Sequence, residues 1–249
     1  MYRNGDCTVI ETPSGKTIII DTGEQENTVV EYLLDRKIKK IVYLTISHFD
    51  SDHSGKSIEI IENLKVKNII ISKQSEQSKE FEDTIKLAQR NKVNIIIAQA
   101  GDTIKIDKEV YFNILWPENN EVIKENALNN NSIVAKMCYK NFSILFTGDI
   151  EAEAETKILQ KYGKEALATT VLKVAHHGSK TSSTEEMIKA IKSKIALIGV
   201  GKDNKFGHPN DEVIERLEAY GNKIYRTDLH GEITLKIDKK GKIKIETQN

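Results

Sequence analysis

The sequence predicts an α/β fold made of layered sheets and helices. Apolar runs of about four to eight residues, the length of buried strands, alternate with longer stretches whose apolar residues repeat at helical spacing. Histidines or aspartates follow several of these runs directly, at positions where functional loops of such proteins lie. The chain has 249 residues, of which 39% are hydrophobic, and no long linker, repeat or low-complexity tract divides it. We therefore expect a single domain over residues 1–249.

The first half of the chain alternates strand-like and helix-like segments. Two apolar runs joined by a Pro/Gly turn at residues 13–16 predict a pair of strands. Val29, Val30, Leu33 and Leu34 lie at helical spacing, and a charged stretch with an apolar stripe predicts a surface helix further on. We expect strands at residues 5–12, 17–23, 41–46, 68–72, 93–98, 103–106 and 110–116, and helices over 25–37, from 54 onward and over 75–91.

The second half begins after a polar, asparagine-rich stretch at residues 119–131, which we expect to be a loop. Short apolar runs then recur between turn residues, and three charged stretches carry apolar residues at helical spacing. We expect strands at residues 131–137, 142–146, 170–175, 195–200, 222–228, 231–237 and 242–246, and helices over 150–162, 184–193 and 212–220. The two halves are thus predicted to be similar in architecture.

The stretch over residues 47–55 combines several metal-binding side chains on one turn. Two histidines and two aspartates fall within six residues: His48, Asp50, Asp52 and His53. A strand-like run precedes them and a helix start follows, so they are expected at the carboxyl end of a strand. Imidazole nitrogen and carboxylate oxygen both suit zinc, manganese or iron. Without a metal these groups would desolvate and repel one another, so we predict a metal site.

The pattern His-x-Asp-x-Asp-His-x-Gly over residues 48–55 resembles the signature of the metallo-β-lactamase-fold hydrolases. Asp50 stands where most of that superfamily has a second histidine. This variant is similar to the C-terminal hydrolase domain of the competence DNA-uptake (ComEC-type) family and its free-standing relatives. The resemblance implies a four-layer αβ/βα sandwich. It also implies that Asp21, in Asp-Thr-Gly, supports the metal loop by hydrogen bonds, and an ordinary Asp-x-Gly turn is the alternative.

Two motifs in the second half match the same family. Thr147-Gly148-Asp149 ends a strand-like run, and the resemblance implies that Asp149 bridges two metal ions. His176-His177-Gly178-Ser179 follows another such run and precedes a helix. One of its two histidines is expected to complete a metal's ligand shell, and we favour His177 over His176.

The polar residues around and after the second motif are candidates for binding substrate: Ser179, Lys180, Thr181 and Ser182. Near a helix start, such groups can donate hydrogen bonds to a phosphate. The alternative is N-capping of the helix by Ser182, Ser183 or Thr184, and the two roles are compatible.

The motif residues suffice for two metal ions, by analogy with the family. One ion would be bound by His48, Asp50 and Asp149, and the other by Asp52, His53, Asp149 and His177. The first set is short of a ligand, because no histidine lies between His53 and His176. Asn131 lies where that ligand is expected and is a candidate for binding metal or substrate. An oxygen-rich set shifts preference toward manganese over zinc, so we expect one or two divalent ions, zinc or manganese.

Two such ions can bind and polarise a phosphodiester while activating a water molecule. The sequence therefore predicts a metal-dependent hydrolase, a phosphodiesterase or nuclease whose substrates include single-stranded DNA. Asp52 is assigned to catalysis as well as to metal binding. His208, in Gly-His-Pro, is the candidate for protonating the leaving group or stabilising the phosphate. The alternative is a catalytically weak, metal-binding accessory domain associated with DNA uptake or another partner protein, which Asp50 and the missing histidine favour.

The overall charge narrows the partner classes. There are 37 basic and 37 acidic residues, so the net charge gives no overall attraction for nucleic acid. A local basic patch is still compatible with this composition. No apolar stretch approaches the roughly 18 residues of a membrane span. The first residues lack the apolar core of a signal peptide, and we expect a cytoplasmic protein. Nothing in the sequence indicates an oligomeric state.

Overall fold

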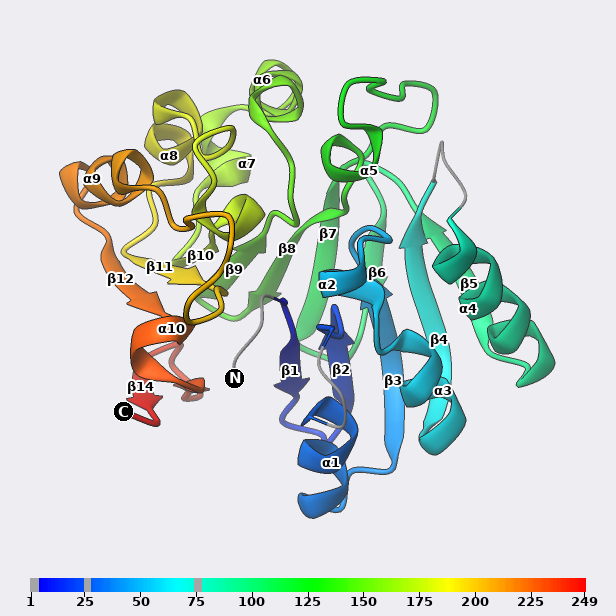
Figure 1. The fold of residues 1–249 in the computed structure, drawn as a ribbon. Helices are drawn as coiled ribbons and strands as arrows, with labels where there is room; N and C mark the ends of the chain where they lie inside the picture. The colour runs from blue at the N-terminus through cyan, green and yellow to red at the C-terminus, as the bar shows by residue number, and fades with distance from the viewer. Residues whose placement is uncertain (1–4, 25–27, 74–77) are drawn as a thin grey trace.

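The fold is a stack of four layers in the order helices, sheet, sheet, helices (Figure 1). The computed structural model describes residues 5–24, 28–73 and 78–249. Apolar clusters fill the space between the two sheets and the space between each sheet and its helices. This is the αβ/βα sandwich that the sequence resemblance implied.

The first sheet has five strands in the order β1-β2-β3-β4-β5. β1 runs antiparallel to β2, and the remaining neighbours are parallel. The strands are β1 (Thr8–Glu11), β2 (Thr17–Ile20), β3 (Lys40–Ile46), β4 (Lys65–Ser72) and β5 (Asn94–Ala98). Its outer face is covered by helices α1 (Thr28–Asp35), α3 (Ser57–Asn63) and α4 (Lys79–Arg90).

The second sheet has seven strands in the order β12-β11-β10-β9-β8-β7-β6. The four strands from β9 to β12 are mutually parallel, and β6 to β9 are antiparallel. The strands are β6 (Thr103–Lys105), β7 (Val110–Trp116), β8 (Val134–Tyr139), β9 (Phe142–Phe146), β10 (Val171–Lys173), β11 (Ile195–Ile198) and β12 (Lys223–Arg226). Its outer face is covered by α6 (Ala152–Lys161), α7 (Lys164–Leu167), α8 (Glu185–Ile191) and α9 (Asp211–Ala219).

Alternation along the strands divides side chains between the layers. In β2, Ile18 and Ile20 point into the core between the sheets, whereas Ile19 points to the helices of the first half. In β9, Ile144 faces the core between the sheets and Leu145 faces the helices of the second half. Because both faces of each sheet are covered, these strands read as continuous apolar runs rather than alternating ones.

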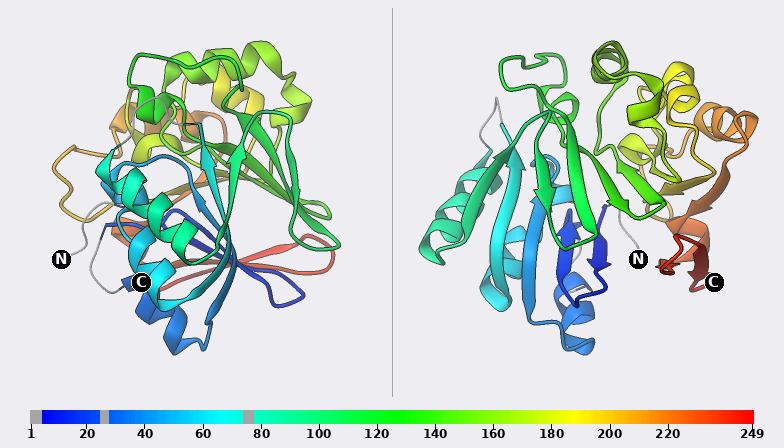
Figure 2. Two further views of the ribbon diagram at one scale, coloured as in Figure 1. Left: turned by 90° about the vertical axis from the view of Figure 1, so that its right-hand side faces the viewer. Right: turned by 180° about the vertical axis from the view of Figure 1, so that it is seen from behind.

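A third, two-stranded sheet follows the second half. Its strands are β13 (Ile233–Ile237) and β14 (Ile243–Thr247). Leu235 and Ile237 pack against the core between the two large sheets, and Figure 2 shows this C-terminal hairpin in red. Within the described residues, no helix is both long and apolar enough to cross a bilayer.

The expected strands and long helices are present, and the differences lie in the connections. The helix expected from residue 54 is split, and its first part, α2 (Ser51–Ser54), places Asp52 and His53 on a helical turn. The asparagine-rich loop contains a short helix, α5 (Ala127–Asn130). Two further single turns, α7 and α10 (Thr227–His230), were not predicted. The first residues of the helices expected over 25–37 and 75–91 lie outside the described residues.

The carboxyl ends of the parallel strands create one edge on which functional side chains collect. The metal loop follows β3, and Asp149 follows β9. A short 3-10 turn, η1 (Ala175–Gly178), follows β10 and carries both histidines of the second motif. β9 and β10 are parallel neighbours in the second sheet, so Asp149 and η1 share one edge, and the metal loop of the first sheet meets them there, with His53 3.2 Å from Asp149 and 3.3 Å from His177.

Candidate metal centre

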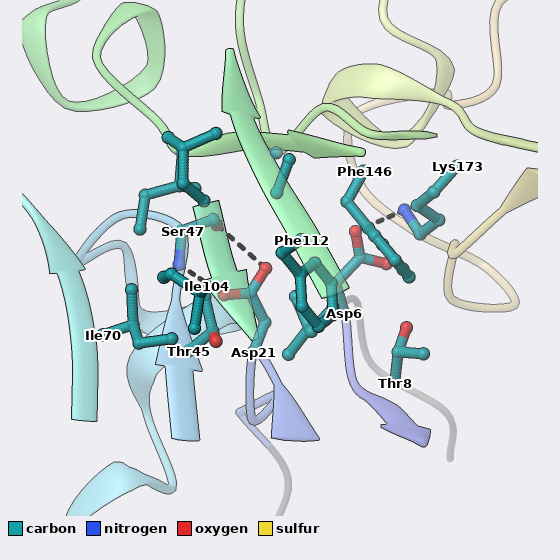
Figure 3. Close-up of a pocket in the computed structure, with 15 residues that line it drawn as sticks. Asp6, Thr8, Asp21, Thr45, Ser47, Ile70, Ile104, Phe112, Phe146 and Lys173 are labelled. Atoms are coloured by element: carbon teal, nitrogen blue, oxygen red, sulfur yellow. Dashed lines mark hydrogen bonds and ion pairs between the residues drawn. The ribbon is translucent and has the colours of Figure 1, made fainter. Parts of the chain in front are cut away.

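A hydrogen-bonded frame fixes the metal loop where β3 ends. Asp21, directly after β2, has a positive φ of 56°. Its carboxylate accepts hydrogen bonds from the Ser47 backbone nitrogen at 2.7 Å and from Ser47 Oγ at 2.8 Å (Figure 3). The same carboxylate lies 2.9 Å from His53 Nδ1. Asp21 therefore holds both the start of the loop and the ring of His53, so the expected supporting role is confirmed.

His53 and His177 face each other in a way that calls for a cation. His177 Nδ1 donates to the Gly199 carbonyl at 2.7 Å, and His53 Nδ1 donates to Asp21. With both Nδ1 atoms donating, the Nε2 atoms of neutral rings carry lone pairs, and these two atoms are 3.3 Å apart. The two residues are buried, with His53 0% and His177 3% exposed, so bulk water has little access to the space between their Nε2 atoms. A proton or a metal ion must offset the repulsion.

Asp149 completes this group from the second sheet. Its Oδ1 lies 3.2 Å from His53 Nε2, and its Oδ2 lies 3.6 Å from His177 Nε2. Burial alone would raise the pKa of the Asp149 carboxyl, but the charges of His53 and His177 outweigh burial and hold this pKa well below its usual range. Burial would lower the pKa of His53, but Asp149 and Asp21 outweigh it and raise this pKa well above its usual value. The group thus stabilises positive charge at its centre.

His48 lies beside His53, with the two ring centroids 4.2 Å apart. Its Nδ1 is 3.0 Å from Ser47 Oγ. Its Nε2 is buried without a hydrogen-bond partner in the described part of the chain, and so is Asp149 Oδ1. His48, His53 and Asp149 each bring one ligand atom within 4.8 Å of the others. Asp50 lies at the rim, with Oδ2 3.5 Å from His48 Nε2 and a side chain that is 41% exposed.

Asp52 and His176 flank the group at different distances. Asp52 Oδ2 lies 3.1 Å from His177 Nε2. Burial would raise the pKa of Asp52, but the hydrogen bond with His177 and the charge of His53 outweigh it and lower the pKa to about 2. His176 is further away, with Nε2 3.9 Å from Asp149 Oδ2 and Nδ1 3.7 Å from a Glu151 oxygen. The distances favour His177 over His176 as the ligand.

These donors fit a divalent metal ion. Opposed Nε2 atoms, an orphaned buried imidazole nitrogen and an orphaned buried carboxylate oxygen are explained together by one positive centre. The two expected ligand sets are not separate in the structure, because His53 lies close to members of both. It contacts His177 and Asp149, and it also groups with His48.

Asn131 is used elsewhere. Its amide oxygen accepts a hydrogen bond from the Ile123 backbone nitrogen at 3.1 Å. Its amide nitrogen donates to the Ile123 carbonyl at 2.8 Å and to the Ala127 carbonyl at 2.6 Å. These bonds tie the asparagine-rich loop to itself, and no described contact joins Asn131 to the histidine group. The structure therefore shows Asn131 stabilising its own loop, and a role in binding metal or substrate stays a prediction.

The polar residues after His177 differ in exposure and in hydrogen bonding. Ser182 is fully buried, and its Oγ has no hydrogen-bond partner among the described residues. Ser179 Oγ lies 3.0 Å from Thr181 Oγ1, which lies 3.4 Å from His176 Nδ1. The Lys180 side chain is exposed. Thr184 is the residue that caps α8, because its side chain accepts from the Met187 backbone nitrogen, so the capping alternative is confirmed for Thr184.

His208 lies next to the histidine group without being part of it. Its ring meets the His176 ring edge-on, with centroids 5.7 Å apart and planes at 65°. His208 Nδ1 is buried and has no hydrogen-bond partner within the described residues. Burial lowers the pKa of His208, and the charges of His176 and His177 lower it further. His208 therefore lies beside the centre with a pKa below the ordinary value of an imidazole.

Sequence reasoning missed an ion pair that joins the two halves behind this centre. Lys173, the last residue of β10, contacts the carboxylate of Asp6 (Figure 3). The two side chains are 12% and 8% exposed, and they line a cavity of about 30 Å³ between the sheets. The Asp6 backbone nitrogen also donates to the Asp52 carbonyl at 3.0 Å. The one available signal was a lysine, Lys173, within an otherwise apolar run.

Gly148 lets the backbone before Asp149 pack closely against Ser132, and we expect Gly148→Ala to destabilise the fold. Gly148 has a φ of +52°, and a Cβ there would lie 2.6 Å from Ser132 Cβ. Strain and overpacking together predict a loss of at least about 1–3 kcal/mol in the free energy of unfolding. Urea denaturation measures it, with Gly163→Ala as control, since no atom lies within 4 Å of a Cβ at Gly163. Equal midpoints for the two variants would contradict the prediction.

Comparison with protein families identifies the fold family. The model described as the metallo-beta-lactamase superfamily matches residues 2–202. The chain belongs to this superfamily. The match includes the metal loop, Asp149 and both histidines of the second motif, so the residues that form the centre are those of the family region.

The relatives of this superfamily member include competence-related proteins. The chain is 32% identical over 208 residues to ComE operon protein 3 of Bacillus subtilis, covering 84% of the chain and 26% of that protein. It is 26% identical over 236 residues to the competence protein ComA of Neisseria gonorrhoeae, covering 94% of the chain and 31% of that protein. The chain thus spans about a quarter to a third of the length of these relatives. The expected resemblance to the competence family is confirmed.

A solved structure shows the same fold. CmlA, a diiron β-hydroxylase from Streptomyces venezuelae, superposes with a TM-score of 0.58 at 13% identity, over 90% of this chain and 52% of that one. At this identity the likeness concerns the fold and not the reaction.

Proposed function

We propose that this chain is a metal-dependent hydrolase of phosphodiesters and that single-stranded DNA is its substrate class. The observation that carries the proposal is the pair of opposed, buried Nε2 atoms of His53 and His177 beside Asp149. The metal would be held by these three residues and His48, with Asp50 and Asp52 at its margins. A divalent ion in this place supplies Lewis acidity, which activates water and withdraws charge from a phosphate.

The chain's own residues contribute orientation and proton transfer. Asp21 and the Gly199 carbonyl fix the rings of His53 and His177, so that their Nε2 atoms stay directed at the centre. Asp52 is ionised beside His177 and is the residue placed to orient an attacking water. His208 lies outside the ligand group and within ring contact of His176. We assign it to protonation of the leaving oxygen or to hydrogen bonding with the phosphate.

The choice of DNA is supported by the relatives, which include the competence protein ComA of Neisseria gonorrhoeae. The superfamily membership supports hydrolysis, and the chemistry of the donor set supports a divalent ion of the zinc or manganese type. A catalytically weak accessory domain is the competing proposal. The exposed position of Asp50 and the hydrogen bonding of Asn131 within its own loop favour this alternative, because both weaken the ligand set expected for the first metal ion.

Metal analysis combined with diester hydrolysis tests the proposal. The protein is loaded with manganese or zinc and assayed with bis-p-nitrophenyl phosphate and with single-stranded DNA. We expect His208→Ala to retain its metal and to lose about 10²- to 10⁴-fold in kcat, the usual range for a general acid. His230→Ala is the matched control, because the described hydrogen bonds of the His230 side chain go to the Arg226 backbone within its own turn.

Two results would change the assignment. Loss of metal from His208→Ala would make this residue a ligand. Absence of diester cleavage by the wild type under both metal loadings would reject the hydrolase proposal and leave the accessory-domain proposal.

A further inference from the structure

Phe206 stands at the mouth of the metal centre and faces solvent. It is 71% exposed, more than any other large apolar side chain of the described residues. Its ring stacks on the ring of His208, with centroids 5.9 Å apart and planes 18° from parallel. His208 in turn contacts His176. A continuous series of rings therefore leads from solvent to the histidine group.

The loop that presents Phe206 is braced rather than loose. The Asn204 side chain donates to the His208 carbonyl at 2.6 Å and accepts from the His208 backbone nitrogen at 2.9 Å. After His208, Pro209 packs so tightly on the turn of the second motif that a Cβ at Gly178 would lie 2.5 Å from Pro209 Cβ. Phe206 is thus held outward by its surroundings, where an aromatic ring gains nothing from burial.

The charged neighbours of Phe206 are mainly basic. Lys202 and Lys205 lie on the same loop with exposed side chains, and Asp203 is the acidic residue of residues 201–208. Lys180 is also exposed, and its backbone nitrogen donates to Asn210 at 2.8 Å, which brings the two loops together. The loop that presents the exposed ring thus carries two lysines and one aspartate, and the acidic Asp211 and Glu212 follow only in the next helix.

We propose that Phe206 is a stacking platform for a nucleobase of a single-stranded nucleic acid whose phosphodiester lies at the metal centre. Lys180, Lys202 and Lys205 then contact neighbouring phosphates. The inference rests on the proposed hydrolase function and specifies its substrate. Every base offers a π face, so an aromatic ring beside cationic groups binds single strands with little sequence preference. A docking protein would need a wider apolar patch, and lysines and glycine flank this ring instead.

Binding of a labelled oligothymidine, measured by fluorescence anisotropy in EDTA and again with manganese, tests the inference. We expect Phe206→Ala to bind about 5- to 150-fold more weakly, the range for loss of one stacked base, and Phe206→Trp to bind like the wild type. The wild type should bind an abasic oligonucleotide of equal length as weakly as Phe206→Ala binds the oligothymidine. Phe206→Ala should not distinguish the two oligonucleotides.

Ile97→Ala is the matched control, because Ile97 is 61% exposed on β5, at the edge of the first sheet. Equal binding of the oligothymidine by Phe206→Ala and the wild type would overturn the inference. So would equal binding of both oligonucleotides by the wild type, or no binding at all. Bis-p-nitrophenyl phosphate hydrolysis by the wild type is scored separately. If it is absent while Phe206→Ala still weakens binding, the platform stands and the hydrolase proposal fails.

Discussion

Replacing His53 with alanine is expected to remove metal binding almost completely. His53 Nε2 lies within 3.3 Å of His177 Nε2 and 3.2 Å of Asp149 Oδ1, so its loss deletes the donor that both contact. Asp21→Ala leaves all direct donors in place and releases the His53 ring together with Ser47 at the start of the metal loop. It is expected to weaken metal affinity by about 10- to 100-fold, the usual effect of losing a residue that orients a ligand.

Thermal unfolding with and without manganese or zinc provides the measurement, alongside metal content after dialysis. At a free metal concentration of 100 times Kd, binding stabilises the wild type by about 2.7 kcal/mol, and this gain should vanish in His53→Ala. His230→Ala should retain the full shift. A His53→Ala variant that keeps stoichiometric metal and the wild-type shift would show that the centre lies elsewhere.

The same titration should depend on pH in a defined direction. Burial would lower the pKa of both His53 and His177, but the neighbouring carboxylates outweigh it, raising the pKa of His53 well above its usual value and raising that of His177 as well, so the metal-free centre binds protons more tightly than free imidazoles do. The metal must displace these protons, and its apparent affinity should therefore rise as pH rises and fall as pH falls. Buffer-dependent heats in calorimetry would count the protons released.

Local patterns in the sequence predicted a layered α/β domain with the site residues at the carboxyl ends of strands, whereas the order of the four layers was implied by the family resemblance. Ile18, Ile19 and Ile20 are apolar in succession, as expected for a strand covered on both faces. The histidines and aspartates come directly after strands, and parallel strands bring their carboxyl ends together. His177 could be favoured over His176 only by family resemblance, because adjacent residues of one type give no geometric signal.

Other features depended on partners that local patterns do not reveal. The Gly199 carbonyl holds His177, and any residue at that position would offer a carbonyl. Asn131 resembled a ligand by its position, but its amide binds backbone groups within its own loop. Asp6 and Lys173 are 167 residues apart in the sequence, so nothing local indicated that they would pair.

Lys173→Met is expected to lower the free energy of unfolding by about 3–5 kcal/mol, the usual result of leaving one partner of a buried ion pair alone. Lys173 and Asp6 are almost fully enclosed, and the Asp6 carboxylate has no room to move, since Gly199 approaches it so closely that a Cβ there would overlap it. Asp6→Asn should be destabilising in the same way. The double variant should lose less than the two single losses added, because neither charge is left unpaired.

Urea denaturation of the four proteins gives the coupling energy directly. Lys86→Met is the control, since Lys86 pairs with Glu82 at 2.8 Å on the surface, and its midpoint should stay that of the wild type. A Lys173→Met midpoint equal to that of the control would contradict the prediction. Metal content should fall along with stability. Lys173 ends the strand that leads to His177, and the Asp6 backbone holds the carbonyl of Asp52, so the pair fixes both sides of the centre from behind.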